Sequence, residues 1–270
     1  MPRLSVNELT TYQWSFEEDV CHYAEAGISA IGIWRQKLSD YGEEKGVELL
    51  RETNLEVSNL LWAGGFTGSD GRSYQESLQD AAAAIRMAGF IGCPTLVLYS
   101  GGRGGHTSRH ARRLFVSALT ALAPIAEEEA VDLAIEPMHP ACAEEWTFLT
   151  TLESTLEIIS EFDHPHVKLA FDTYHLGHES NLVQRIEEFV DRIGIVHLGD
   201  GCAAPKYEQN RCQLGKGNVP WREIVEALSG AGYDGYYDIE LLGEDVEQED
   251  YEQLIRCSKA ALEKRFAVPA

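Results

Sequence analysis

The sequence predicts a single (β/α)8 barrel, a TIM barrel, that spans residues 1–270. Three observations support this prediction. The length of 270 residues is typical of the fold. Eight apolar, strand-like runs alternate with eight amphipathic stretches of helical period along the chain. No internal repeat, low-complexity tract or linker rich in proline or serine divides the sequence into further domains.

The predicted strands are rich in β-branched and aromatic residues, and several are continuous apolar runs such as TLVLY and IGIVHL. Such runs are expected when helices cover one face of a strand and the other face fills a barrel interior. The first run, LSVNEL, is shorter and more polar than the others. We predict strands near residues 4–6, 30–34, 57–62, 95–99, 133–136, 167–172, 194–198 and 236–241.

Capping signals mark the ends of the predicted helices. Ser15 precedes Glu18 by three residues, and Thr150 precedes Glu153 by three, which is the capping-box pattern. Glycines such as Gly92 stand between a helix and the next strand, where a left-handed residue is needed. We predict helices over residues 16–26, 42–53, 74–91, 109–130, 152–162, 181–191, 221–231 and 248–266.

The composition excludes several classes of function. A formal charge of −22 and a pI near 4.7 argue against nucleic acid and anionic membranes as partners. No apolar run is long enough to span a bilayer, and the N-terminus lacks the apolar region of a signal peptide. The six cysteines form no C-x-x-C pair, so we expect free thiols and a cytoplasmic location. A monomer and a homo-oligomer both remain compatible with this composition.

Four ionisable residues close the last four predicted strands: Glu136 in LAIEP, Asp172 in KLAFDTYH, His197 in IGIVHLGD and Glu240 in YYDIELLG. Because the carboxyl ends of parallel strands meet at one rim of a barrel, these side chains are expected to converge. Three carboxylates and an imidazole would repel one another without a cation. We therefore predict one divalent metal ion, with Mn²⁺ first, Mg²⁺ next, and Co²⁺ or Zn²⁺ as alternatives.

This predicted site suits the removal of a proton from the carbon next to a carbonyl. The resulting enediolate carries a negative oxygen that a metal ion stabilises as a Lewis acid. One carboxylate takes the proton, and a second, on the opposite face, returns it with inverted configuration or at the neighbouring carbon. Glu136 and Glu240 are the predicted pair.

The motifs EPMHP, FDTYH, VHLGD, RCQLGKGNVPW and YDIEL, in this order, resemble the xylose isomerase-like TIM-barrel superfamily. The similarity covers about half the chain and is greatest to its sugar (phosphate) isomerase/epimerase group, which includes tagatose and psicose 3-epimerases, hydroxypyruvate isomerase and inosose dehydratase. It implies that Glu136, Asp172, His197 and Glu240 hold the ion and that the two glutamates are acid and base. It also implies that His175 and Arg211 contact substrate oxygens.

One position departs from the ketose 3-epimerase pattern. Those enzymes place a second glutamate six residues after the first, where this sequence has Cys142. His139, three residues after Glu136, either contacts the substrate, orients Glu136 or is an ordinary loop residue packed beside two prolines. The predicted ligand is a small sugar, a polyol or a sugar phosphate.

Other functions stay open at this point. The same site would serve a dehydratase, a lyase acting on a cyclic ketone such as an inosose or dehydroshikimate. A non-catalytic sugar- or metal-binding protein would also keep the pocket. A DNA-repair endonuclease of the superfamily is rejected, because the extra histidines it needs are absent and the charge is −22.

The glycine-rich stretches SGGRGGHTSRH and LGKGN allow a phosphate loop or plain turns. Trp14, Trp34 and Trp62, near the first three strand ends, allow either a sugar-stacking wall or rim packing.

Overall fold

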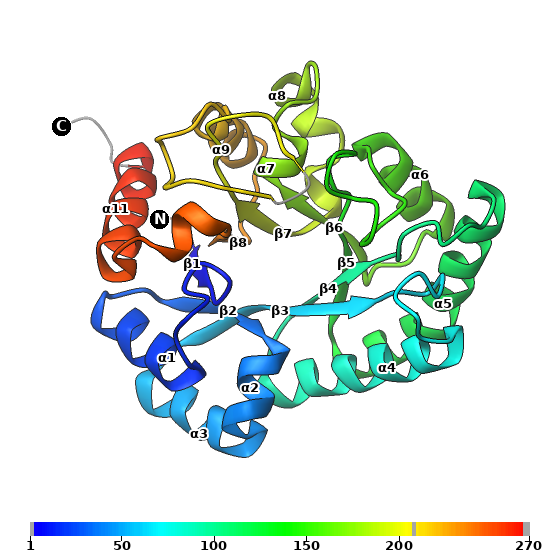
Figure 1. The fold of residues 1–270 in the computed structure, drawn as a ribbon, viewed down its shortest axis with the longest axis horizontal. Coiled ribbons are helices and arrows are strands. Elements are labelled where there is room, and N and C mark those ends of the chain that lie inside the picture. The colour runs from blue at the N-terminus through cyan, green and yellow to red at the C-terminus, as the bar shows by residue number, and fades with distance from the viewer. Residues whose placement is uncertain (1–2, 207–208, 267–270) are drawn as a thin grey trace.

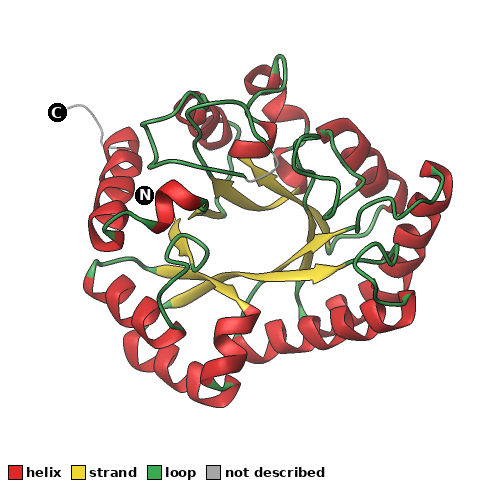
Figure 2. Cartoon of the chain, viewed as in Figure 1, coloured by secondary structure: helices red, strands yellow, loops and turns green. Residues whose placement is uncertain are grey.

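The computed structural model describes residues 3–206 and 209–266. Within these ranges, eight parallel strands close into a barrel in chain order, and the last strand pairs with the first. Figure 1 shows the strands as a central ring, and Figure 2 shows the helices around it. The predicted (β/α)8 barrel is thereby confirmed. The strands are β1 (Arg3–Asn7), β2 (Ala30–Trp34), β3 (Glu56–Gly64), β4 (Thr95–Tyr99), β5 (Asp132–Ile135), β6 (Val167–Asp172), β7 (Ile193–Leu198) and β8 (Tyr236–Ile239).

Local capping chemistry explains where several helices begin. Ser15 and Glu18 form the predicted capping box, but the predicted box at Thr150 is wrong. Thr151 caps that helix instead, because its own hydroxyl accepts the backbone N–H of Ser154. The α-helices are α1 (Phe16–Glu25), α2 (Arg35–Tyr41), α3 (Glu43–Thr53), α4 (Tyr74–Ile91), α5 (Ser108–Glu129), α6 (Leu152–Phe162), α7 (Thr173–Leu176), α8 (Leu182–Arg185), α9 (Trp221–Gly230), α10 (Glu244–Glu247) and α11 (Tyr251–Phe266).

One predicted helix is largely absent, and three short helices were not predicted. The stretch 181–191 holds only α8 and two 3-10 turns, Ile186–Glu188 and Val190–Arg192. Its buried residues Ile186 and Phe189 are three positions apart, a spacing that a 3-10 turn also satisfies. The short helices α2 and α7 begin directly at the ends of β2 and β6, and α10 begins in the loop after β8, all at the rim where the site lies.

Apolar side chains form two layers on the two faces of the barrel wall. The larger layer packs between strands and helices, with residues such as Phe115 and Trp221 fully buried. The smaller layer fills the barrel interior with residues such as Ala134, Ala170 and Ile195. In the described residues, no helix has both the length and the apolar character needed to cross a lipid bilayer.

A buried charge cluster fixes the loop after β1, and we name it the β1 cluster: Glu8, Asp19 and Lys37. The Nζ atom of Lys37 donates to Asp19 Oδ2 at 2.6 Å and to the carbonyl oxygens of Glu8 and Thr11 at 3.1 and 3.0 Å. The Oε2 atom of Glu8 accepts the backbone N–H of Trp34 at 2.7 Å. Burial, together with the neighbouring Asp19, raises the pKa of Glu8 well above its usual value. The cluster therefore joins β1, α1 and the end of β2.

Candidate active site

The ends of the last four strands bring the predicted ligands together. Asp172 and His197 lie in β6 and β7, whereas Glu136 and Glu240 follow directly after β5 and β8. All four side chains are buried. Potential ligand atoms of Glu136, Asp172 and His197 lie within 4.8 Å of one another, as a metal site requires. We name these residues, together with Glu240 and Arg211, the site cluster.

His197 lies between the two glutamates. Its Nδ1 atom is 2.9 Å from Glu240 Oε2 and 3.7 Å from Glu136 Oε1. Although burial opposes the charged imidazole, both carboxylates raise the pKa of His197 well above its usual value. Burial raises the pKa of Glu136. For Glu240, the nearby His197 and Arg211 outweigh burial and lower the pKa to about 2.

Arg211 crosses the site between two of the predicted ligands. Its Nη2 atom is 2.9 Å from Asp172 Oδ2 and 3.2 Å from Glu240 Oε1. Its Nη1 atom donates to the Glu240 carbonyl oxygen at 2.9 Å, and its guanidinium lies 4.7 Å from the centre of the Tyr174 ring. The predicted role of Arg211 was to contact substrate, and these ion pairs place its guanidinium at the site.

His175 lies beside the cluster, and His139 lies farther out. The Nε2 atom of His175 is 4.0 Å from Asp172 Oδ2, and burial lowers the pKa of His175 to about 4. Cys142, at the position of the second epimerase glutamate, places its Sγ atom 3.6 Å from His175 Nδ1. The His139 ring lies 6.4 Å from the His178 ring, and His139 is not among the residues that line the cavity described below.

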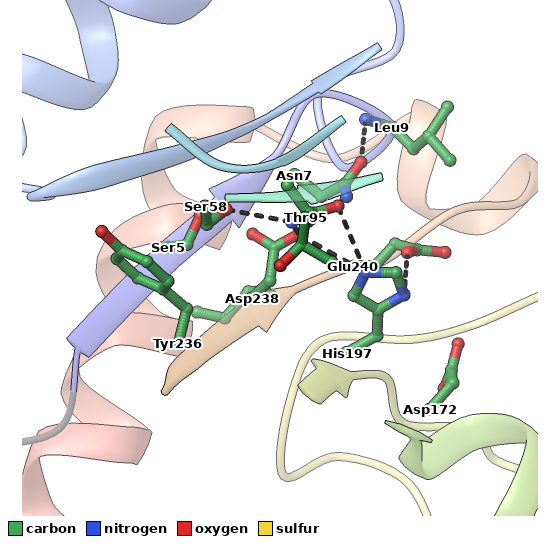
Figure 3. Close-up of polar contacts among 12 residues, drawn as sticks. Ser5, Asn7, Leu9, Ser58, Thr95, Asp172, His197, Tyr236, Asp238 and Glu240 are labelled. Carbon is green, nitrogen blue, oxygen red and sulfur yellow. Dashed lines mark hydrogen bonds and ion pairs between the residues drawn. The ribbon is translucent and has the colours of Figure 1, made fainter. Parts of the chain in front are cut away.

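A column of buried polar residues inside the barrel lies next to His197 (Figure 3). The Nε2 atom of His197 is 3.4 Å from Asn59 Oδ1 and 3.9 Å from Asp238 Oδ2. Asp238 Oδ2 also accepts from Asn7 and Asn59, at 2.8 Å each. Gly32 leaves room for this contact, because a Cβ atom there would overlap Asp238 Oδ2.

This polar column was not predicted from the sequence. Asp238 precedes Glu240 by two residues in the same strand run, so both side chains point to one face of the strand. That spacing was the available signal. For Asn7 and Asn59, the available signal was that each is a polar residue in an otherwise apolar strand run.

A cavity of about 70 Å³ opens at the site cluster. Glu136, Glu240, Arg211 and His175 line one side of it. The remaining lining is mostly apolar and aromatic: Leu9, Leu61, Trp62, Tyr99, Met138, Trp146, Gln209 and Leu242. Such an arrangement, a few converging polar groups in an apolar pocket, is typical of a small-molecule site.

The two glycine-rich stretches lie outside this cavity lining. In LGKGN, the backbone N–H groups of Gly215 and Gly217 donate to Asp200 Oδ2 at 2.8 and 3.0 Å. Those amides are therefore already bonded within the protein, which favours the plain-turn interpretation over a phosphate loop. In SGGRGGHTSRH, Thr107 caps α5 by accepting the backbone N–H of His110.

The donor set fits a divalent ion. Asp172 Oδ2 and His197 Nδ1 are buried and have ion-pair neighbours, but neither has a hydrogen-bond partner. Buried polar atoms are rarely left in this state. Carboxylate oxygens with one imidazole nitrogen suit Mn²⁺ or Mg²⁺, and also tolerate Zn²⁺ or Co²⁺. These two atoms, whose neighbours at 2.9 Å are the charged groups of Arg211 and Glu240, are the ligand atoms that an ion at this position would use.

The chain is similar to two proteins of known sequence and to one solved structure in particular. The D-psicose 3-epimerase of Enterocloster bolteae is 36% identical over 121 residues, which cover 44% of this chain and 36% of the epimerase. The putative hydroxypyruvate isomerase of Streptomyces coelicolor is 23% identical over 260 residues, covering 88% of this chain and 90% of that protein. The solved structure of protein SMc04130 from Sinorhizobium meliloti 1021 superimposes with a TM-score of 0.88 and 27% identity, covering 97% of this chain and 98% of that one.

The two named relatives are an epimerase and an isomerase, so the dehydratase alternative receives no support from them. The model of the xylose isomerase-like TIM barrel family matches residues 22–261. Most of the barrel and all four predicted ligands lie within this match. The chain therefore belongs to the xylose isomerase-like TIM barrel family.

Proposed function

We propose that the protein is a divalent-metal-dependent sugar isomerase or epimerase that exchanges a proton on the carbon next to a carbonyl. The observation that carries this proposal is the convergence of Glu136, Asp172 and His197, whose potential ligand atoms lie within 4.8 Å of one another, next to a cavity that Glu136 and Glu240 line. The named relatives, an epimerase and an isomerase, agree with this class of reaction.

Glu136, Asp172, His197 and Glu240 would hold the ion, for which we propose Mn²⁺. A bound divalent ion would polarise the substrate carbonyl and stabilise the negative oxygen that develops during proton removal. The lone pair of His197 Nδ1 is needed for this ligation, so the imidazole must be in its neutral form. Asp238 and Asn59 face the other ring nitrogen of His197 and hold the ring in its orientation.

Glu136 and Glu240 would move the proton. Both line the cavity and come from strands that lie on opposite sides of β6 and β7. A substrate between them therefore meets a carboxylate on each side. One carboxylate takes the proton and the other returns it, which gives an epimerase if the same carbon is reprotonated and an isomerase if the neighbouring carbon is.

His175 and Arg211 would position the substrate. Both are buried and line the cavity, and Arg211 is held by Asp172 and Glu240. Since its guanidinium keeps several N–H donors, it can bond a substrate oxygen while it stays paired with a carboxylate. The low pKa of His175, about 4, keeps its ring neutral and able to donate or accept one hydrogen bond at neutral pH.

The test is proton exchange in D₂O. The metal-loaded protein is incubated with neutral ketoses, sugar phosphates, hydroxypyruvate and inososes, and deuterium uptake is followed by proton NMR with Mg²⁺ as the diamagnetic ion. We expect uptake at one carbon next to the carbonyl. Glu136→Gln and Glu240→Gln are expected to lower the rate by about 10²- to 10⁴-fold, the usual contribution of a catalytic acid or base. Full exchange by either variant would remove the acid–base assignment.

A further inference from the structure

Aromatic rings form a continuous series on the β1–β4 side of the barrel mouth. Tyr12 and Trp34 are stacked with ring centres 5.5 Å apart, and Trp34 and Trp62 are nearly parallel, at 15°, with centres 6.4 Å apart. Centre distances of this size belong to offset stacks, in which part of each ring face stays uncovered. Both tryptophans are half-buried, and Tyr12 is 48% exposed. The series therefore runs from solvent to Trp62, which lines the site cavity.

A second cavity adjoins the site cavity along this series. It has a volume of about 320 Å³, and its lining includes Trp34, Trp62, Leu61 and Tyr99. The last three also line the site cavity, whose volume is only about 70 Å³. Pockets for small molecules usually measure roughly 300–1,000 Å³. The site cavity alone is thus small for a ligand, whereas the adjoining one falls in the usual range.

The polar groups of the second cavity are ordered and balanced in charge. Arg35 pairs with Asp80 at 2.8 Å and donates to the carbonyl oxygen of Trp62 at 3.1 Å. Arg72 pairs with Asp70 at 2.7 Å and with Asp80 at 3.2 Å. Each arginine is therefore neutralised by a carboxylate. Such paired groups still offer donors and acceptors to hydroxyl groups, but they give little attraction to a phosphate.

The site cavity is equally unsuited to a phosphate. Among its described lining residues, Arg211 is the one permanently charged cation, and it is already paired with Asp172 and Glu240. Flat aromatic faces beside paired polar groups suit the apolar face and the hydroxyls of a neutral sugar ring.

We propose that the second cavity is a subsite for a neutral sugar ring, joined by a glycosidic bond to the ketose that reacts at the site cluster. Trp34 and Trp62 would stack on this second ring, and Arg35 and Asp80 would bond its hydroxyls. The substrate is then a neutral disaccharide or glycoside that carries the reactive carbonyl in one unit. This inference rests on the proposed function and narrows its substrate class.

The experiment compares three ketoses that differ only at the 6-oxygen: fructose, fructose 6-phosphate and isomaltulose, in which a glucosyl ring occupies that oxygen. Deuterium uptake next to the carbonyl is measured for each in D₂O, and kcat/KM values are compared. We expect isomaltulose to exceed fructose by roughly tenfold or more, the usual effect of a buried aromatic anchor. We expect fructose 6-phosphate to stay at or below fructose. A higher value for fructose 6-phosphate than for isomaltulose would overturn the proposal.

Variants separate stacking from a general loss of structure. Trp34→Ala, and the exposed Tyr12→Ala as a second change, should lower the ratio of isomaltulose to fructose kcat/KM, by about tenfold for Trp34→Ala. Trp14→Ala is the matched control, because Trp14 stacks on His22 and contacts Tyr251 edge to face, away from the series. The control should keep the wild-type ratio. An unchanged ratio in Trp34→Ala would contradict the subsite.

Different experimental results would contradict the proposed reaction and the proposed subsite. If none of the sugars exchanges its proton, the proposed reaction is wrong, and calorimetric titration with isomaltulose then tests the subsite alone. Binding by the wild type that weakens in Trp34→Ala, but not in Trp14→Ala, would support the subsite. Absence of binding, or equal binding by the wild type and Trp34→Ala, would overturn it.

Discussion

The molecule buries two charge clusters near the same rim of the barrel, and they differ in that only the site cluster lines the site cavity. In the β1 cluster, Lys37 Nζ donates to three oxygens, and burial together with the neighbouring Asp19 raises the pKa of Glu8. In the site cluster, Asp172 Oδ2 and His197 Nδ1 lack hydrogen-bond partners, and the cluster residues Glu136, Glu240 and Arg211 line a cavity. Burial of charge alone thus does not mark a functional site. A buried charge cluster that also lines a cavity does.

This difference predicts that substitutions in the two clusters affect different properties of the protein. The β1 cluster should govern stability, since Lys37 is held by three oxygens and none of the three residues lines the site cavity. The site cluster should govern ligand binding and turnover. Three substitutions test this contrast, and the expected effect decreases from Lys37→Met through Asp238→Asn to Glu8→Gln.

Lys37→Met removes the cation of the β1 cluster and leaves Asp19 buried without its partner. Breaking a buried ion pair in this way costs about 3–5 kcal/mol, because the remaining charge is uncompensated. We expect the free energy of unfolding to fall by that amount in urea denaturation. Metal affinity of the folded protein should change far less. A stability loss near zero would show that the two clusters do not differ as we infer.

Asp238→Asn removes the carboxylate that faces His197 Nε2 in the polar column. Outer partners of a metal-binding histidine usually contribute 10- to 100-fold to metal affinity. We expect a loss of about that size in Mn²⁺ affinity, measured by calorimetric titration, while the circular dichroism spectrum stays the same. Asp234→Asn, an exposed change before the same strand, serves as the control. Equal affinities for the two variants would remove the positioning role.

Glu8→Gln tests the protonation state in the β1 cluster. Because the folded-state pKa of Glu8 is raised, its contribution to stability is present at low pH and is lost as the pH rises through that pKa. Glutamine resembles the protonated form, so the variant should gain stability relative to the wild type as the pH increases. A pKa that folding raises by one corresponds to about 1.4 kcal/mol of free energy. Urea denaturation at pH 6 and pH 9 measures this difference, and the exposed change Glu25→Gln controls for lost surface charge.

If the difference in free energy of unfolding between Glu8→Gln and the wild type stays constant across this pH range, the pKa of Glu8 is not raised in the folded protein. Glu8 would then be ionised in the β1 cluster at both pH values. The contrast with the site cluster would have to rest on the cavity alone.

The fold was predictable because strand runs and helical periods extend over many residues. The eight strands follow apolar runs, whereas α2 and α7 are short segments that begin directly at strand ends and carry little periodic signal. The convergence of Glu136, Asp172 and His197 was predictable from barrel topology, since strand ends share one rim.

Other features depend on contacts between residues far apart in the chain. Asn59 reaches Asp238 across 179 positions, and Lys37 reaches Asp19 from a different helix. No local pattern encodes such pairings. The tryptophans were recognised, but only the structure separates Trp34 and Trp62, which line cavities near the site, from Trp14, which stacks on His22. Spatial pairing, not residue type, distinguishes them.

The most direct test of the central claim is a titration of chelator-treated protein with Mn²⁺, followed by electron paramagnetic resonance of the free ion. We predict one bound Mn²⁺ per chain, with binding abolished in His197→Ala and Asp172→Ala and retained in Lys37→Met. Absence of binding, or binding that survives both site-cluster substitutions, would contradict the account.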